Sequence, residues 1–170
     1  YNKSNIPGRP ESIGVQTGNL INRFVNKKSK KKYLSVLKSL INGCRVLKKS
    51  KCKFIVIPCN TAHYWYDDLV KKIDIPIINM PKEVFKFTIK NCKEKSSIGL
   101  LATEGTLNTG VYNKFFDKKY NLIYPSKIFQ KNSVNKAIKL VKMGNVKAAN
   151  KIIKPAINYL IKKKCKKIIL

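Results

Sequence analysis

Residues 53–69 place a thiol where a predicted strand gives way to a predicted helix. Residues 54–58 (FIVIP) are mostly apolar and β-branched, and Cys59, Asn60 and Thr61 follow them directly. Backbone amides and the positive end of a helix dipole favour a thiolate, and short polar side chains there can cap the helix or bind a carboxylate. The pattern therefore predicts a reactive Cys59 beside an anion site. A buried structural cysteine next to an ordinary cap is the alternative.

A second loop of the same kind follows later in the chain. Residues 102–106 (ATEGT) lie between a predicted strand over residues 96–103 and a helix that begins near Thr106. In parallel α/β sheets, ligands bind at the carboxyl ends of the strands. Two loops built on one plan predict two similar domains, residues 1–95 and residues 96–170.

The elements that must position these loops alternate along the chain. Strands are predicted over residues 54–58, 75–80, 96–103, 121–125 and 165–170. Helices are predicted over residues 11–28, 32–48, 61–73, 82–91, from about 106, over 134–142, and over 146–163, the last interrupted or kinked by Pro155. This alternation is typical of α/β proteins with mostly parallel sheets flanked by helices.

The net charge of +29 at pH 7 invites a nucleic-acid interpretation. However, all of the 37 basic residues are lysines except Arg9, Arg23 and Arg45, and bidentate recognition of bases and phosphates favours arginine. The lysines are spread along the chain among many Asn and Ile residues, as on a solvated surface. We therefore expect no nucleic-acid partner, and we expect the charge to attract anionic metabolites.

The cysteines and the single histidine limit the other possibilities. The five cysteines show no CxxC spacing, and His63 alone cannot complete a Cys/His zinc site of the usual kind, so no metal is predicted. Free thiols indicate a reducing compartment, which predicts a cytoplasmic protein. No apolar run approaches the roughly 20 residues of a membrane span, so no membrane partner is expected.

Three segments resemble the aspartate/glutamate racemase family: residues 58–63 (PCNTAH), residues 102–112 (ATEGT through Tyr112) and residues 6–13 (IPGRPESI). The resemblance covers essentially the whole chain in order. It implies two similar α/β domains with the active site between them, no cofactor and a homodimer. It also implies racemisation of aspartate or glutamate: one thiolate removes the α-proton, and a second thiol delivers a proton to the opposite face.

The resemblance also assigns the site. It implies that Cys59 is the first catalytic cysteine. Five residues would bind the dicarboxylic substrate, namely Arg9, Asn60, Thr61, Thr103 and Lys142. Arg9 and Lys142 match cations for the side-chain carboxylate, with an ordinary surface lysine as the alternative for Lys142. His63 is expected to form hydrogen bonds in the first helical turn rather than to act as a base.

The sequence departs from the family pattern at both ends. The second cysteine of the family follows a strand that matches residues 166–170, so it would come directly after Leu170. The first strand and glycine-rich loop of the family would precede Tyr1. We therefore expect the middle part of a longer racemase, truncated at both ends. The other cysteines, Cys44, Cys52 and Cys92, are expected to be packing residues, and Cys165 enters the last strand rather than following it.

Two other functions stay open. One is a related enzyme with the same pair of cysteines, such as a maleate isomerase or a hydantoin racemase. The other is a catalytically inactive remnant without the second cysteine, which binds anions or nucleic acid.

Overall fold

The computed structural model describes residues 11–170, with side chains from Thr17 onward. Arg9 lies outside the described residues. Contacts between backbone positions divide the described chain into an N-terminal unit, residues 11–83, and a C-terminal unit, Val84–Leu170. The division falls inside helix α4 (Met80–Asn91), whereas the predicted boundary follows residue 95. The assignment of two domains stays a prediction.

The N-terminal unit combines helices with a short parallel sheet. Its elements are α1 (Glu11–Asn26), α2 (Lys30–Lys49), β1 (Ile55–Val56), the 3₁₀-helix η1 (Thr61–Trp65), α3 (Tyr66–Val70) and β2 (Ile77–Ile78). Helix α2 begins after Ser29, whose Oγ accepts a hydrogen bond from the Lys32 backbone N–H at 3.3 Å, as expected of an N-cap. Strands β1 and β2 pair in parallel, with Ile55 opposite Ile77.

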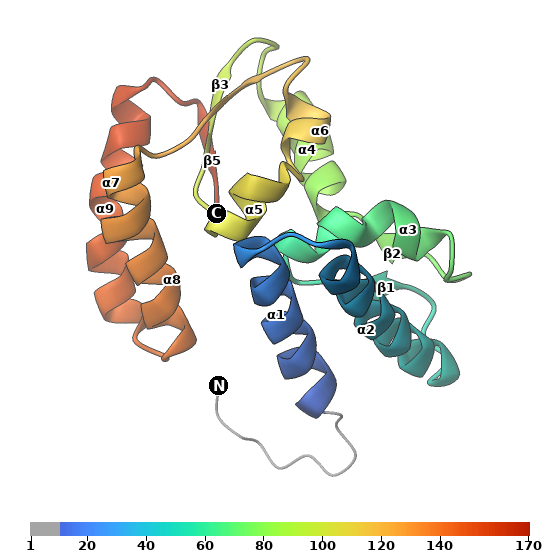
Figure 1. Ribbon diagram of the computed structural model, residues 1–170. Helices are drawn as coiled ribbons and strands as arrows, with labels where there is room; N and C mark the ends of the chain where they lie inside the picture. The colour runs from blue at the N-terminus through green and yellow to red at the C-terminus, as the bar shows by residue number, and fades with distance from the viewer. Residues whose placement is uncertain (1–10) are drawn as a thin grey trace. The chain divides into compact units, whose positions relative to one another are not determined.

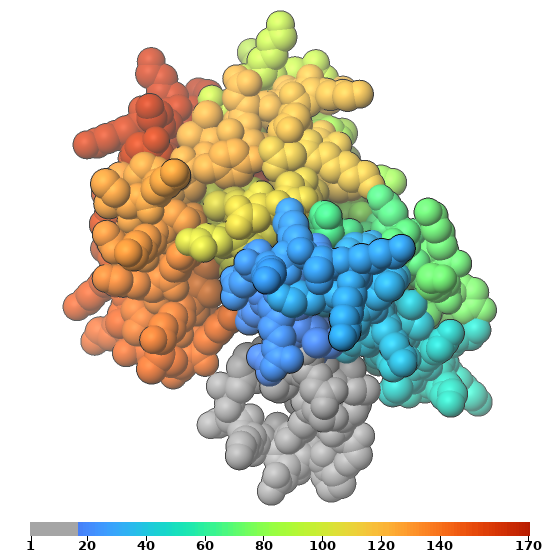
Figure 2. Space-filling view, viewed as in Figure 1, coloured from blue at the N-terminus to red at the C-terminus, as the bar shows by residue number. Residues whose placement is uncertain are grey.

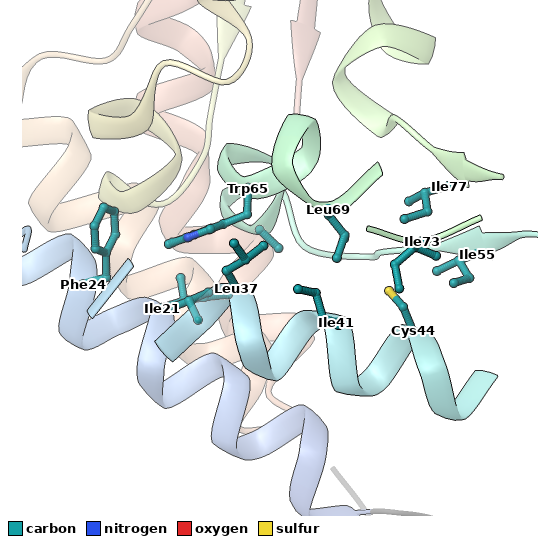
Figure 3. Packing of buried hydrophobic residues seen from close by; sticks show 12 residues of the cluster. Ile21, Phe24, Leu37, Ile41, Cys44, Ile55, Trp65, Leu69, Ile73 and Ile77 are labelled. Atoms are coloured by element: carbon teal, nitrogen blue, oxygen red, sulfur yellow. The ribbon is translucent and has the colours of Figure 1, made fainter. Parts of the chain in front are cut away.

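The core of this unit lies between the helices and one face of the sheet. Phe24 of α1, Leu37 of α2 and Trp65 of η1 pack together, and Ile55 and Ile77 lie further along the same core (Figure 3). The next residue in each strand points the other way, because successive strand residues alternate between faces. The sheet thus contributes only one residue per strand to this core.

The C-terminal unit is built on a three-stranded parallel sheet. After α4 its elements are β3 (Ser97–Leu100), α5 (Glu104–Thr109), α6 (Asn113–Phe116), β4 (Asn121–Ile123), α7 (Lys127–Phe129), the π-helix η2 (Gln130–Val134), α8 (Asn135–Lys142), α9 (Val146–Lys162) and β5 (Lys167–Ile169). The strand order is β4-β3-β5. The central strand β3 is buried at Ile98 and Leu100, as expected of a parallel strand with helices on both faces.

The helical layer of this unit differs from the sequence expectation. A helix was predicted over residues 134–142, but helical structure begins at Lys127, so that α7, η2 and α8 run end to end beside α9 (Figure 1). Helix α9 continues through Pro155, so the predicted interruption there is wrong. The buried face of this layer includes Val134, Ala156 and Leu160. It packs against the sheet that carries the loop after β3.

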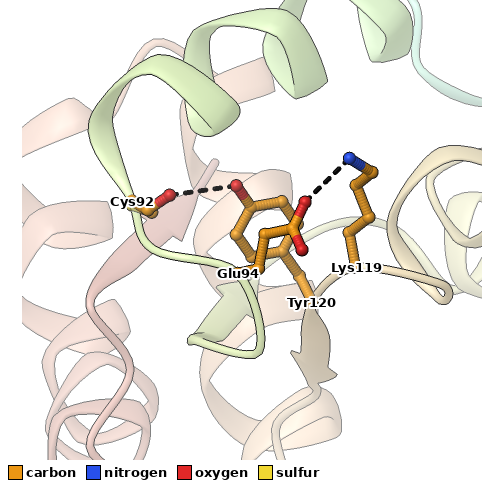
Figure 4. A network of polar contacts seen from close by, with 4 residues as sticks. All are labelled: Cys92, Glu94, Lys119 and Tyr120. Atoms are coloured by element: carbon orange, nitrogen blue, oxygen red, sulfur yellow. Dashed lines mark hydrogen bonds and ion pairs between the residues drawn. The ribbon is translucent and has the colours of Figure 1, made fainter.

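The loop between α4 and β3 is tied to the start of β4 (Figure 4). The Tyr120 hydroxyl donates to the Cys92 carbonyl at 3.1 Å, and Lys119 Nζ pairs with Glu94 Oε1 at 2.7 Å. The hydrogen-bonded ammonium of Lys119 holds the pKa of the Glu94 carboxyl below its usual value. Because the pair is exposed, it contributes little to stability, and the loop is held mainly by the tyrosine and by backbone bonds.

The C-terminal part of the chain has a lysine-rich surface. Every lysine after Asp117 is exposed, and Figure 2 shows parts of this segment, coloured orange to red, on the face in view.

All five cysteines are free, and Cys44 is buried in the core of the N-terminal unit. No helix among residues 11–170 has the length and apolar character of a membrane span.

Candidate active site

Cys59 lies on the surface of the loop that leaves strand β1. Its side chain is exposed, so the alternative of a cysteine sealed in the core is wrong. The Cys59 backbone N–H donates to the Ile57 carbonyl at 2.8 Å, and the Cys59 carbonyl accepts from the Ala62 N–H at 3.2 Å. These bonds form a tight turn that holds the backbone under an accessible thiol.

His63 fastens this turn to the end of β2. The imidazole is buried, with Nδ1 2.9 Å from the Cys59 carbonyl oxygen. Its Nε2 accepts a hydrogen bond from the Met80 backbone N–H at 3.2 Å. Since Nε2 must be the acceptor, the proton resides on Nδ1 and is donated to Cys59. Both ring nitrogens of the neutral imidazole therefore form hydrogen bonds, and His63 has a structural role in the turn.

The environment of His63 favours that neutral form. Burial lowers the pKa of the imidazole below its usual value, and its backbone hydrogen bonds oppose this shift without overcoming it. The expectation that His63 makes hydrogen bonds rather than acting as a base agrees with this geometry. Its partner on Met80 was not predicted, because residues 17 positions apart in the sequence meet only when β1 and β2 pair.

The helix after Cys59 is not the one predicted. A single α-helix was expected over residues 61–73, but the chain forms the five-residue 3₁₀-helix η1 and then the five-residue α3. Both helices are too short for their peptide dipoles to add up to a large helix dipole. The predicted stabilisation of a Cys59 thiolate by such a dipole is therefore small. Asn60 is half-buried and Thr61 is buried at the start of η1.

The second predicted loop follows β3 in the C-terminal unit. Thr103 is the N-cap of α5, and its Oγ1 accepts from the Thr106 backbone N–H at 3.2 Å. The two threonine hydroxyl oxygens are 3.1 Å apart. Thr103 thus has a capping role that is independent of any substrate. The half-buried Thr103 lies just beyond the carboxyl end of the central strand, where parallel α/β sheets bind ligands.

The remaining predicted site residues are less constrained. Lys142 is an exposed residue at the end of α8, which fits a substrate cation and an ordinary surface lysine equally well. Among residues 11–170, no group of three or more His, Cys, Asp or Glu side chains is arranged to hold a metal ion. Two buried or half-buried amide residues near the β3–α5 loop, Gln130 and Asn135, were missed by sequence reasoning.

Parallel strands that alternate with helices define an α/β protein. The chain belongs to the Asp/Glu/Hydantoin racemase family, whose model matches residues 7–170. This match confirms the family indicated by the PCNTAH and ATEGT motifs.

Known relatives have similar sequences over part of their length. The broad specificity amino-acid racemase RacX of Bacillus subtilis (strain 168) is 29% identical over 108 residues, which are 64% of this chain and 46% of RacX. The glutamate racemase of Oceanobacillus iheyensis is 33% identical over 67 residues, which are 39% of this chain and 24% of that enzyme. The aligned part of the chain thus spans less than half the length of either relative.

Solved structures share the fold at low sequence identity. An aspartate racemase homologue from Pyrococcus horikoshii OT3 has a TM-score of 0.68 at 16% identity, covering 93% of this chain and 79% of that one. The aspartate racemase of Picrophilus torridus has a TM-score of 0.60 at 21% identity, covering 89% and 72%. These neighbours confirm the predicted α/β class.

Proposed function

We propose that this chain contributes to an amino-acid racemase acting on aspartate or glutamate, without a cofactor. The observation that carries the proposal is the exposed Cys59 on a turn fixed by His63, in a chain of the racemase family. In the proposed reaction the Cys59 thiolate takes the α-proton and becomes a thiol. The electron pair left on Cα is delocalised into the α-carboxylate, and a thiol on the opposite face then returns a proton to Cα.

The fixed turn suits this chemistry. An amino-acid α-proton is a very weak acid, so a catalyst must hold the base and the carboxylate in place rather than let them reorganise during the reaction. The two hydrogen bonds of His63 and the backbone bonds of the turn fix Cys59 from the interior side. The thiol is left facing outward, where a substrate can reach it.

The other roles follow the family resemblance. Asn60, Thr61 and Thr103 would bind the α-carboxylate and amino group, and Arg9 and Lys142 would neutralise the side-chain carboxylate. Thr61 is buried, so its contribution would come through its backbone N–H or through a small movement of the turn. The homodimer and the cytoplasmic location also stay predictions.

The two-thiol mechanism requires a second cysteine, and the sheet suggests its place. Strand β5 lies next to β3 in parallel register, with Ile169 opposite Leu100. The carboxyl end of β5 therefore opens at the same edge of the sheet as Thr103. A cysteine directly after Leu170 would stand at that edge, and the coding sequence following Leu170 tests this placement.

Isotope exchange tests the reaction itself. In deuterium oxide, racemisation of L-aspartate or L-glutamate incorporates solvent deuterium at Cα, whereas isomerisation of maleate by a related enzyme labels neither amino acid. We expect exchange to be abolished in Cys59→Ala and Cys59→Ser and kept in Cys52→Ser, a matched change of a half-buried cysteine outside the proposed site. Equal exchange in Cys59→Ala and in the wild type would refute the proposal.

A second candidate, polyanion binding, is favoured by one specific observation. The 53 residues after Asp117 contain 15 lysines and no Asp or Glu, and all of these lysines are exposed. A polyanion that bound here would be released steeply by salt. If the protein binds single-stranded DNA with such a salt dependence, and Cys59→Ala binds equally well, this candidate would replace the racemase.

A further inference from the structure

Two side chains of the helical layer hold the loop that carries Thr103. Gln130, the first residue of the π-helix η2, is buried, and its Nε2 donates to the Ala102 carbonyl at 2.9 Å and to Asn135 Oδ1 at 2.8 Å. Asn135, the first residue of α8, donates through Nδ2 to Glu104 Oε1 at 2.8 Å. These hydrogen bonds thus hold both neighbours of Thr103: Ala102 through its backbone carbonyl and Glu104 through its carboxylate.

The same arrangement leaves one polar atom of Gln130 without a partner. Gln130 is 7% exposed, and its Oε1 is buried with no hydrogen-bond partner among the described residues. A buried acceptor without a partner is unfavourable. The π-helical turn that starts at Gln130 is itself rare, and such turns are frequently found at functional sites.

The geometry points to Gln130 and Asn135 as positioning residues that fix Thr103 at the carboxyl end of β3. This inference rests on the proposed function in so far as Thr103 binds the substrate. The hydrogen bonds from Gln130 prevent the Ala102 peptide from turning, and the bond from Asn135 holds the first residue of α5. Thr103 therefore keeps one backbone conformation, and its hydroxyl keeps one direction.

Amide hydrogen exchange tests whether these hydrogen bonds hold the loop in place, and it requires no enzymatic activity. The informative amides are those of Thr106, which donates to Thr103 Oγ1 at 3.2 Å, and Leu107, which donates to the Thr103 carbonyl at 3.1 Å. In Gln130→Met, which keeps the length of the side chain, we expect both amides to exchange about tenfold faster, the ratio given by about 1.4 kcal/mol of lost hydrogen bonding. Amides in the middle of α9 should keep their wild-type rates.

Three further variants are compared with Gln130→Met. Asn132→Leu alters an exposed amide of the same π-helix, and we expect no change at Thr106 or Leu107. Glu104→Gln keeps an acceptor for Asn135 and should retain the protection, whereas Glu104→Leu should lose part of it. Unchanged loop exchange in Gln130→Met would overturn the inference. So would an equal acceleration throughout α9, because the residue would then support the fold and not the loop.

Kinetics test the consequence for the substrate. If the protein racemises aspartate or glutamate, Gln130→Met should raise KM about tenfold while kcat changes less than threefold, since the thiol is untouched and only binding is loosened. A fall in kcat at constant KM would overturn the positioning role. If the wild type shows no exchange at Cα, the proposed function fails, and the amide measurements still decide whether Gln130 and Asn135 hold the loop.

Discussion

Because His63 is buried, we predict that the stability of the N-terminal unit depends on pH over a narrow pH interval. The unfolded chain should bind a proton on His63 near pH 6.5, whereas burial lowers the pKa of the folded imidazole. Below about pH 6.5 the unfolded state therefore binds more protons than the folded state, and stability falls as the pH falls. It is restored above that pH, where the imidazole is neutral in both states.

The size of the effect follows from linkage. The free energy of unfolding cannot change by more than about 1.4 kcal/mol per pH unit for one titrating group. For a folded pKa far below 6.5, the free energy of unfolding would fall by at most about 1.3 kcal/mol between pH 7 and pH 5.5. For a chain of this size, that corresponds to a decrease in Tm of about 3–5 °C.

The measurement can be assigned to single residues. His63 is the single histidine and Trp65 the single tryptophan. Trp65 is fully buried in the same core, with its Nε1 donating to the Tyr33 carbonyl at 3.0 Å. Its fluorescence during urea unfolding therefore reports on the unit that contains His63. The assay compares the free energy of unfolding at several pH values between about 5.5 and 7.

Two variants separate the charge from the hydrogen bonds. His63→Asn can keep a donor near the position of Nδ1, and His63→Gln can keep an acceptor near that of Nε2. Each loses one of the two bonds, so we expect each to be about 1–3 kcal/mol less stable at pH 7, with no pH dependence between pH 5.5 and 7. A flat profile in the wild type, or the same slope in both variants, would refute the reasoning.

Three further predictions concern Gly99 and Thr103 in the C-terminal unit and Tyr33 in the N-terminal unit. Gly99→Ala should destabilise the chain by about 1–3 kcal/mol, because a Cβ there would lie 2.8 Å from Leu160 Cδ1; thermal unfolding should show a smaller penalty for Gly99→Ala in a Leu160→Ala background. Thr103→Ala should cost about 1 kcal/mol by loss of the α5 cap and should also raise KM, while Thr103→Ser keeps both properties; a normal KM in Thr103→Ala would remove this residue from the substrate site. Tyr33→Phe should cost about 1 kcal/mol, because the Tyr33 hydroxyl donates to Asp68 Oδ2 at 2.7 Å, and unchanged urea unfolding would show that solvent replaces this bond fully.

Much of the fold could be predicted from the sequence because its signals are local. The β-branched run at residues 54–58 and the apolar residues within 121–125 contain β1 and β4, and the apolar spacing of residues 32–48 matches α2. The place of Cys59 in the loop after a strand could be inferred from neighbouring residue types alone. Thr103 was predicted to end a strand, with a helix from about residue 106, whereas it is the N-cap of α5. The segments PCNTAH, ATEGT and IPGRPESI together indicated the family that the family model confirms.

The tertiary structure decided what depends on distant partners. Hydrophobic periodicity cannot show that β5 pairs with β3 rather than with β4, because strand order is set by packing across the whole unit. The same holds for the proton on His63 Nδ1, which is fixed by the Met80 amide at the start of α4, and for Gln130, which meets Ala102 from 28 positions away. The sequence alone determined which residues could do chemistry, since that depends on side-chain type and immediate neighbours. Folding determined which of them are held in place, since that requires bonds that close only when separate elements pack.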